Sequence, residues 1–229
     1  MKEAWKMEEL VTKHSAILDK YDPNKKAALV VDEWGGWYDV EQGTNPGFLY
    51  QQNTMRDAMI AGITLNIFNN HADRVRMANL AQCVNVLQSV ILTDKEKMIL
   101  TPTYHVMEMY NIHQDAKLIP LIVSKSNYVL GNDTLQAISA SASVDANGKT
   151  HISIVNIDPQ KEQSISVDVS SQKYNSVTGR ILTSAALQDH NSFDEPNKIK
   201  PVAFKKASLN GNTLTVQLPP ISVVMLELK

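Results

Sequence analysis

Residues 27–38, which read AALVVDEWGGWY, decide the fold of the first half of this chain. The apolar run 27–31 shows no polar alternation, which is typical of a strand buried on both faces in a helix-covered parallel sheet. Asp32 and Glu33 end that run, and two glycines flanked by tryptophans follow. In α/β barrels the C-terminal ends of the strands carry the chemistry. Glu33 is therefore a candidate catalytic carboxylate, and an acid beside flat aromatic rings suits a site that cleaves sugars.

The residues around this strand predict alternating helices and strands. Apolar positions spaced by three and four residues indicate helices, and a Thr-Pro pair supplies an N-cap and a first-turn proline. A second apolar run indicates another buried strand. We expect helices over 7–21, 53–69, 73–84 and 101–113, and a strand over 86–92. Such alternation implies a parallel sheet.

From residue 118 onward the sequence changes to short alternating runs separated by Gly, Asn and Pro. The pairs Asn147-Gly148 and Asn210-Gly211 signal tight hairpins between such runs. Many short strands with turns at this spacing are typical of an antiparallel β-sandwich. We therefore divide the chain into an α/β portion, 1–117, and a β-sandwich portion, 118–229, with the boundary between residues 115 and 120.

The α/β portion poses a physical problem, because two parallel strands cannot close a barrel of eight. Either a small open α/β layer packs against the sandwich, or the chain is the last part of a larger (β/α)8 TIM barrel. We favour the second alternative, since a strand that is apolar on both faces needs neighbours on both sides.

Composition and motif spacing exclude several classes of partner. The formal net charge of −2 argues against nucleic acid and anionic membrane surfaces, and no apolar run approaches the length of a membrane span. The segment after Met1 is charged and amphipathic, so we expect no secretory signal there. No HxxxH or CxxC spacing occurs, so we expect no metal and no cofactor, and we read His71 with Arg74 as a structural cluster. The lone Cys83 is expected to be a buried core thiol.

Four segments together resemble one enzyme family, the α-L-arabinofuranosidases of glycoside hydrolase family fifty-one. The segments are 31–38 (VDEWGGWY), 71–86, 100–106 and 218–228. The family combines an eight-stranded α/β barrel with a jelly-roll sandwich, and its members are retaining exo-hydrolases of terminal α-L-arabinofuranosyl groups in arabinan and arabinoxylan. The resemblance implies that 1–117 holds the seventh and eighth barrel strands and that 118–229 is most of the sandwich.

The resemblance also implies roles for individual residues. Glu33 matches the family nucleophile, and Trp37 matches an aromatic residue that borders the arabinose pocket. Trp34 is a second substrate-binding candidate, with core packing as its alternative. Gly35 departs from the family, where Asn is frequent at that position. The family's acid/base follows Gly-Asn, and no Gly-Asn-Glu occurs in this sequence. We therefore expect this chain alone to be inactive.

Two further readings remain open for the sandwich. It could be a non-catalytic carbohydrate-binding module, or it could serve structure and assembly, and the family's frequent oligomers make a homo-oligomer a candidate. Binding sandwiches display rows of exposed aromatic residues, whereas no Trp follows residue 118. The aromatic residues there are Tyr128, Tyr174, Phe193 and Phe204. An arabinose-containing polysaccharide or oligosaccharide is the partner that the resemblance implies.

Overall fold

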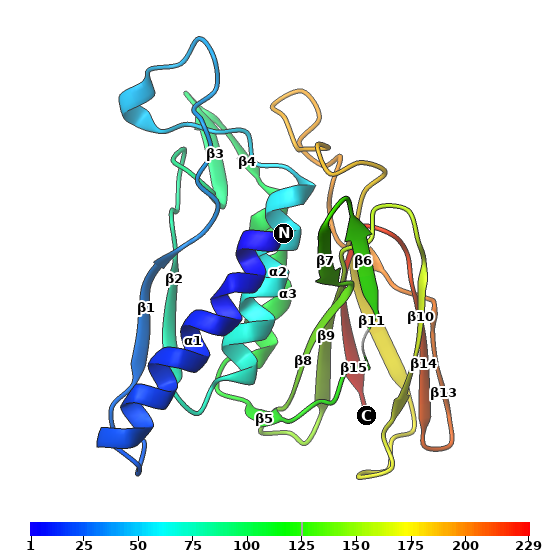
Figure 1. Ribbon diagram of the computed structural model, residues 1–229. Coiled ribbons are helices and arrows are strands. Elements are labelled where there is room, and N and C mark those ends of the chain that lie inside the picture. Colours follow the sequence, from blue (N-terminus) through cyan, green and yellow to red (C-terminus); the bar gives the residue numbers. More distant parts are fainter. Residues whose placement is uncertain (125) are drawn as a thin grey trace.

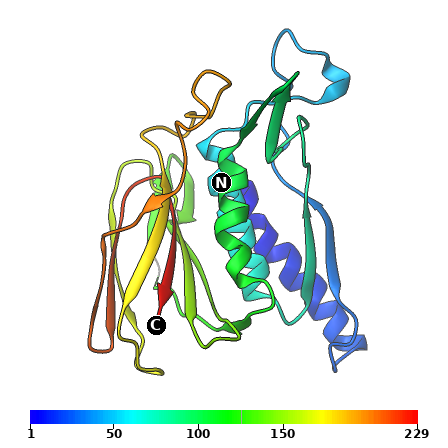
Figure 2. The same cartoon turned by 180° about the vertical axis from the view of Figure 1, so that it is seen from behind.

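A computed structural model describes residues 1–124 and 126–229, and it forms three layers (Figure 1). A pair of parallel strands lies on one side, three helices lie in the middle, and antiparallel sheets lie on the other side; the reverse view shows the same order (Figure 2). The helices are α1 (Lys2–Tyr21), α2 (Met55–Asn70) and α3 (Pro102–Tyr110), with 3-10 turns at Pro46–Phe48 and Asn111–His113. Among the described residues, no helix has both the length and the apolar character to cross a membrane.

The first layer contains the strand that the apolar run 27–31 predicts. Its strands are β1 (Leu29–Trp34) and β2 (Val75–Leu80), and two more strands, β3 (Ile91–Asp94) and β4 (Lys97–Leu100), form a hairpin beyond it. β1 pairs with β2 in parallel, so a parallel pair is present as predicted, but its second strand is 75–80 and not the expected 86–92. The predicted helices at 7–21, 53–69 and 101–113 are confirmed as α1, α2, and α3 with its 3-10 extension.

Two predicted elements are wrong. The expected helix over 73–84 is strand β2, because pairing with β1 fixes its backbone and apolar residues such as Val75 and Met77 also fit a two-residue period. The expected strand over 86–92 forms only from Ile91 onward. Asn85 and Leu87 have φ angles of 57° and 51°, and this left-handed backbone interrupts any strand there.

Burial in the first layer also differs from expectation. β1 is not buried on both faces: Leu29 and Val31 pack towards the helices, whereas Val30 is 43% exposed. The reason is that, among the residues that the structure describes, β2 alone lies beside β1 and no layer covers its far face. Cys83, expected in the core, is exposed because its segment leaves β2 as an irregular loop.

The third layer is an antiparallel β-sandwich. Its sheets have the orders β12-β11-β15-β9-β8-β5 and β10-β14-β13, and β6 and β7 form a separate hairpin. The strands are β5 (Lys117–Ile119), β6 (Asn127–Leu130), β7 (Asp133–Gln136), β8 (Ile138–Val144), β9 (Thr150–Asn156), β10 (Gln163–Asp168), β11 (Val177–Thr183), β12 (Val202–Ala203), β13 (Ala207–Asn210), β14 (Thr213–Leu218) and β15 (Ser222–Leu228). The predicted hairpins at Asn147-Gly148 and Asn210-Gly211 are confirmed.

The helices and the sandwich share one core. Buried residues of α2, α3, β9 and β15 belong to the same apolar cluster. Gly62 permits the close approach of α2 to the sheet, since a Cβ there would lie 2.8 Å from Val155 Cγ2. Beside it, the buried Asn66 amide accepts hydrogen bonds from Tyr110, Ser141 and Ser153 and donates one to Ser139. These contacts join the two layers firmly.

A second set of contacts ties α1 to the strand pair. The guanidinium of Arg74 is fully buried and pairs with Asp19 at 2.6 Å and with Asp22 at 2.8 Å. His71 lies 2.7 Å from Glu8 of α1, and this hydrogen bond raises the pKa of His71 above its ordinary value. The prediction that His71 and Arg74 form a structural cluster is therefore confirmed.

Candidate functional site

The predicted site residues lie where β1 ends. Glu33 is the second-last residue of the strand, and its side chain is exposed. The β1–β2 register shifts between Val31 and Trp34, so that three steps along β1 match two along β2. Such a bulge changes which way the following side chains point. It brings Trp34 into the same apolar cluster as Val31, whereas Asp32 and Glu33 between them are both exposed.

The two tryptophans have different surroundings. Trp34 is buried against Phe68 of α2, with ring centroids 5.7 Å apart and an edge-on geometry. Its Nε1 has no hydrogen-bond partner among the described residues. Trp37 is 69% exposed and presents its ring at the surface. The substrate-binding role expected for both residues stays a prediction, and Trp37 has the exposure that a sugar-stacking ring requires.

The turn after the strand depends on its two glycines. Gly35 has a φ of +146°, and a Cβ there would lie 3.0 Å from the carbonyl oxygen of Ala81. A Cβ on Gly36 would lie 2.9 Å from the ring of Tyr38. At Gly35 only glycine leaves the backbone unstrained, and at Gly36 a Cβ would require the Tyr38 ring to shift. The Gly35 that departs from the resembled family thus meets a steric requirement of this turn.

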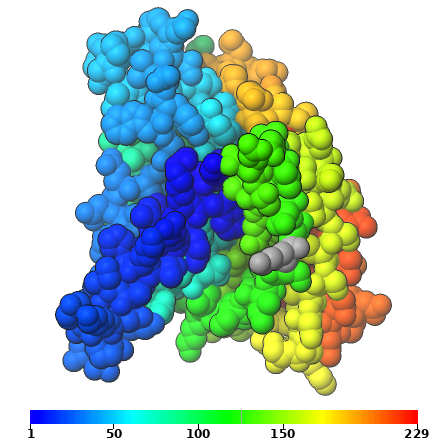
Figure 3. Space-filling model, viewed as in Figure 1, coloured from blue at the N-terminus to red at the C-terminus, as the bar shows by residue number. Residues whose placement is uncertain are grey.

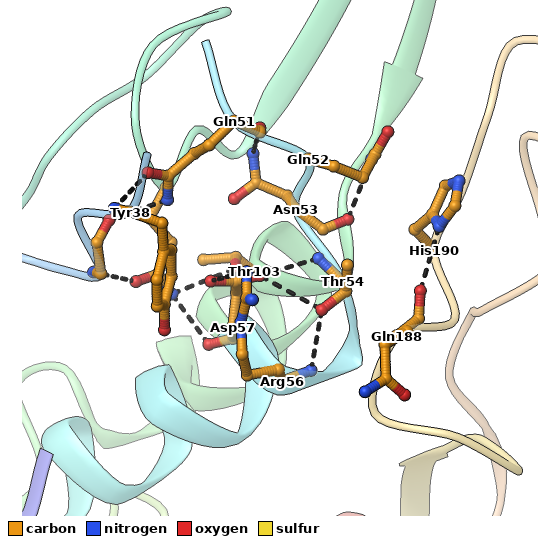
Figure 4. Close-up of polar contacts among 12 residues, drawn as sticks. Tyr38, Gln51, Gln52, Asn53, Thr54, Arg56, Asp57, Thr103, Gln188 and His190 are labelled. Carbon is orange, nitrogen blue, oxygen red and sulfur yellow. Dashed lines mark hydrogen bonds and ion pairs between the residues drawn. The ribbon is translucent and has the colours of Figure 1, made fainter. Parts of the chain in front are cut away.

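Two buried glutamines, Gln51 and Gln88, hold the turn from the other side, and Figure 4 shows the contacts of Gln51 with it. Gln51 donates from Nε2 to the Gly36 carbonyl at 2.9 Å and accepts from the Tyr38 N–H at 2.8 Å. Gln88 accepts from the Gly36 N–H at 2.7 Å, and its Nε2 donates to the Asp57 carbonyl at 2.8 Å and to Thr103 Oγ1 at 3.2 Å. One amide thus links the turn to the first turns of α2 and α3.

The start of α2 places the charged residues Arg56 and Asp57 close to this turn. Thr54 and Asp57 form a capping box, which satisfies free N–H groups at the helix start. The side chain of Asp57 is fully buried, and burial raises the pKa of its carboxyl despite the Arg56 guanidinium at 3.1 Å. That guanidinium also lies 3.8 Å from the centre of the Tyr38 ring. Arg56 and Asp57 therefore brace the turn beneath Trp37.

A loop of the sandwich completes the cap on α2. The N–H groups of Met55 and Arg56 donate to the carbonyls of Asp189 and Leu187, at 2.8 and 2.9 Å. The loop has its own support, because His190 Nδ1 lies 3.0 Å from the Gln188 carbonyl (Figure 4). The third layer therefore contributes directly to the helix start on which the site rests.

Two hollows lie close to these residues. One, of about 330 Å³, is lined by Trp34, Trp37 and Tyr38 and by the start of α1. The other, of about 470 Å³, is mainly apolar and is lined by Phe48 and Tyr50 on one side and Phe193 on the other. The segment that carries Phe48 and the sandwich loop that carries Phe193 lie at the same end of the molecule (Figure 3). Within residues 1–124 and 126–229, no three His, Cys, Asp or Glu side chains gather as a metal site requires.

Sequence reasoning missed Gln51 and Gln88. A signal was present for Gln88, which interrupts the apolar run 86–92 and is nevertheless fully buried. A polar side chain in such a run must find hydrogen-bond partners when it is buried, and the partners here are the Gly36 N–H of the turn, the Asp57 carbonyl and Thr103 Oγ1. Gln51 lies in an irregular segment without any periodic pattern, so nothing in the sequence distinguishes it.

A carboxylate at the end of a parallel strand, helices behind that strand and a sandwich beyond them define the C-terminal portion of a glycoside hydrolase. The chain belongs to the α-L-arabinofuranosidase C-terminal domain family, whose model matches residues 32–222. The resemblance described above is thereby confirmed.

Individual relatives agree with this assignment. The chain is 47% identical over 224 residues to an intracellular exo-α-L-arabinofuranosidase of Bacteroides ovatus, covering 97% of this chain and 44% of the relative. It superposes with a TM-score of 0.98 and 49% identity on a family 51 arabinofuranosidase from Xanthomonas axonopodis pv. citri, covering all of this chain and 46% of that one. A thermostable family 51 enzyme from Thermotoga petrophila, at 22% identity and a TM-score of 0.84, shares the fold; 100% of this chain and 49% of that one are covered. The chain thus spans less than half the length of these relatives.

Proposed function

We propose that this chain supplies the nucleophile of a retaining exo-α-L-arabinofuranosidase, and that Glu33 is that nucleophile. The observation that carries the proposal is the place of Glu33: an exposed carboxylate at the C-terminal end of a parallel strand, four residues before an exposed tryptophan. In barrels built from such strands, this end holds the reacting groups. Membership in the arabinofuranosidase family supports the substrate class, terminal α-L-arabinofuranosyl groups of arabinan or arabinoxylan.

The chemistry requires two carboxyl groups. A carboxylate oxygen of Glu33 attacks the anomeric carbon while the bond from that carbon to the leaving oxygen breaks, and a second carboxylic acid protonates the leaving oxygen. Water then attacks the same carbon, gives its proton to the second carboxylate and releases arabinose, which regenerates Glu33. The two carboxyls must lie about 5–5.5 Å apart. The sequence holds no Gly-Asn-Glu, so we assign the acid/base to the part of the enzyme outside residues 1–229.

We further propose that residues 1–117 are the last part of a TIM barrel. The open far face of β1, with Val30 and Met77 exposed, supports a location inside a larger barrel. In that setting the ring of Trp37 would border the arabinose, and no cofactor or metal takes part. Residues 118–229 would then be a sandwich that braces the barrel, because the two portions share a core.

The test uses this chain and a chimera in which it replaces the matching segment of the Bacteroides ovatus enzyme. With 4-nitrophenyl α-L-arabinofuranoside, we expect no turnover from the chain alone and clear turnover from the chimera. Glu33→Gln should lower kcat of the chimera at least about a thousandfold, or ~4 kcal/mol of barrier. Asp32→Asn is the matched control, and it should keep kcat within about threefold of the parent. A Glu33→Gln chimera with parental kcat would refute the assignment.

A second measurement separates the enzyme from a carbohydrate-binding module. Isothermal titration of the chain with arabino-oligosaccharides would report binding directly. Binding that disappears in Glu33→Gln and Trp37→Ala fits the proposed site. Binding that survives both substitutions would place the sugar elsewhere and would support the module instead.

A further inference from the structure

Trp37 combines an exposed side chain with a backbone that is fixed on both sides. The Gln51 side chain donates to the carbonyl of Gly36, just before Trp37, at 2.9 Å, and accepts from the N–H of Tyr38, just after it, at 2.8 Å. The amide of Gln51 therefore holds the backbone on both sides of Trp37, and we call this pair of hydrogen bonds the Gln51 clamp. The tryptophan ring stays 69% exposed, so its own packing does not hold it in place.

The amide that makes this clamp is itself well held. Gln51 is 2% exposed, and its backbone carbonyl lies 3.4 Å from the Nδ2 of Asn53, which also donates to the Leu87 carbonyl at 3.2 Å. Burying an amide is costly unless its donors and acceptors are paired. Both ends of the Gln51 side chain are paired with the turn, which makes one orientation of the amide strongly favoured.

Gln88 adds a second point of attachment from a different segment. It is fully buried and holds the Gly36 N–H while bonding the starts of α2 and α3. Gly36 therefore has both backbone polar groups occupied by side chains that lie 15 and 52 residues away in sequence. An exposed turn could bond water with these groups instead. Side chains from the scaffold give it a fixed position relative to the helices.

We propose that Gln51 and Gln88 are positioning residues, which hold the backbone of residues 36–38 so that the Trp37 side chain projects from a fixed place before a sugar arrives. The inference rests on the proposed function for what the ring contacts. Its physical basis is preorganisation: a ring already in place loses less conformational entropy on binding, and small displacements near reacting atoms are costly. Neither glutamine touches substrate in this scheme, since both are buried beneath the turn.

The first test needs only the chain of residues 1–229. Gln51→Met and Gln88→Met remove the amides at nearly constant size, and Gln52→Met is the matched control, because Gln52 donates to the Asn53 carbonyl and not to the turn. We expect amide hydrogen exchange of Tyr38 in Gln51→Met, and of Gly36 in Gln88→Met, to quicken at least about tenfold. Exchange in Gln52→Met should match the parent. Parental exchange rates of Tyr38 in Gln51→Met and of Gly36 in Gln88→Met would overturn the proposal that these glutamines hold the turn.

A spectroscopic readout follows the ring itself. The emission of Trp37 is obtained as the difference between each variant and the same variant with Trp37→Phe. We expect Gln51→Met to lower the fluorescence anisotropy of Trp37, while circular dichroism shows that the fold is kept. If Gln88→Met fails to fold, Gln51→Met alone decides the proposal. Unchanged anisotropy together with faster exchange would mean that the turn moves and the ring does not, which also overturns it.

The last test uses the chimera and separates this inference from the proposed function. We expect Gln51→Met to lower kcat/KM about tenfold or more, with Gln52→Met unchanged. Gln51→Glu should fall in between, because its carboxylate still accepts from Tyr38 but cannot donate to Gly36. A parental kcat/KM in Gln51→Met would overturn the positioning role while leaving Glu33 untouched. Conversely, a harmless Glu33→Gln refutes the nucleophile, and the exchange and anisotropy results still decide whether the clamp exists.

Discussion

The stability of this chain should depend on the protonation of one histidine between the helices and the sandwich. His113 contacts Ser143 Oγ through Nδ1 at 2.7 Å and Ser153 Oγ through Nε2 at 3.1 Å. Burial, with a smaller contribution from the nearby His151, lowers the pKa of His113 from 6.5 to about 4. The ring is therefore neutral in the folded chain at neutral pH, with one nitrogen donating and the other accepting.

The sign and size of the effect follow from linkage. Between pH 6.5 and about 4, the unfolded chain binds a proton at His113 that the folded chain does not bind, so stability falls as pH falls. The stability that the neutral His113 ring contributes is fully present above pH 6.5 and is lost by about pH 4. A difference of about 2.5 between the folded and unfolded pKa corresponds to about 3 kcal/mol, at 1.36 kcal/mol for each pKa unit.

The assay is urea unfolding by circular dichroism from about pH 7 down to about pH 4.5. His113→Gln keeps a donor and an acceptor for the two serines but cannot titrate, so its free energy of unfolding should decline less over this window, by up to about 3 kcal/mol. His71→Gln gives the opposite sign: its hydrogen bond to Glu8 raises the pKa of His71, so the stability from that pair is present at low pH and is lost as pH rises. Parallel curves for the parent and His113→Gln would refute the reasoning.

Two substitutions at the same interface have further expected outcomes. Asn66→Ala should lower the free energy of unfolding by about 3 kcal/mol, because four buried hydrogen bonds of about 1 kcal/mol each are lost and some regroup; Asn70→Ala, at an exposed bond, should cost under about 1 kcal/mol in the same urea titration. Gly62→Ala should destabilise by about 1–3 kcal/mol despite the better helix propensity of alanine, since its Cβ would lie 2.8 Å from Val155. Adding Val155→Ala should make the double variant more stable than the sum of the two single effects, and strict additivity would contradict the steric explanation.

Local signals in the sequence predicted much of the fold. Thr101 with Pro102 marked the start of α3, where the Thr101 hydroxyl accepts from the Tyr104 N–H. The two Asn-Gly pairs marked hairpins, because their turns need positive φ. The segment 75–80 was wrongly predicted as part of a helix, since its apolar residues fit both periods and the deciding contact is a strand 46 residues earlier, as in the pairing of Leu29 with Val75.

The site was predictable only in part, for a similar reason. Glu33 and Trp37 lie within one short segment, and their predicted roles rest on that segment and on its family resemblance. The groups that fix this segment come from residues 51 and 88 and from the sandwich loop near Asp189, and only the folded chain brings them together. The bulge that redirects Trp34 depends on the β1–β2 register, which no local pattern encodes.

The Leu187 and Asp189 carbonyls of the sandwich cap the start of α2, and this contact limits which parts of the chain can be exchanged between homologues. Excising residues 118–229 would remove the acceptor of the Met55 N–H, leave the Arg56 N–H with its bond to Thr54 Oγ1 at 3.2 Å, and open the shared apolar cluster to water. Exchanging the sandwich for an unrelated module would do the same unless the replacement brought an equivalent loop. Chimeras between homologues should therefore fold when residues 1–229 are transferred together. They should fail to fold when the crossover lies at the boundary between residues 117 and 118.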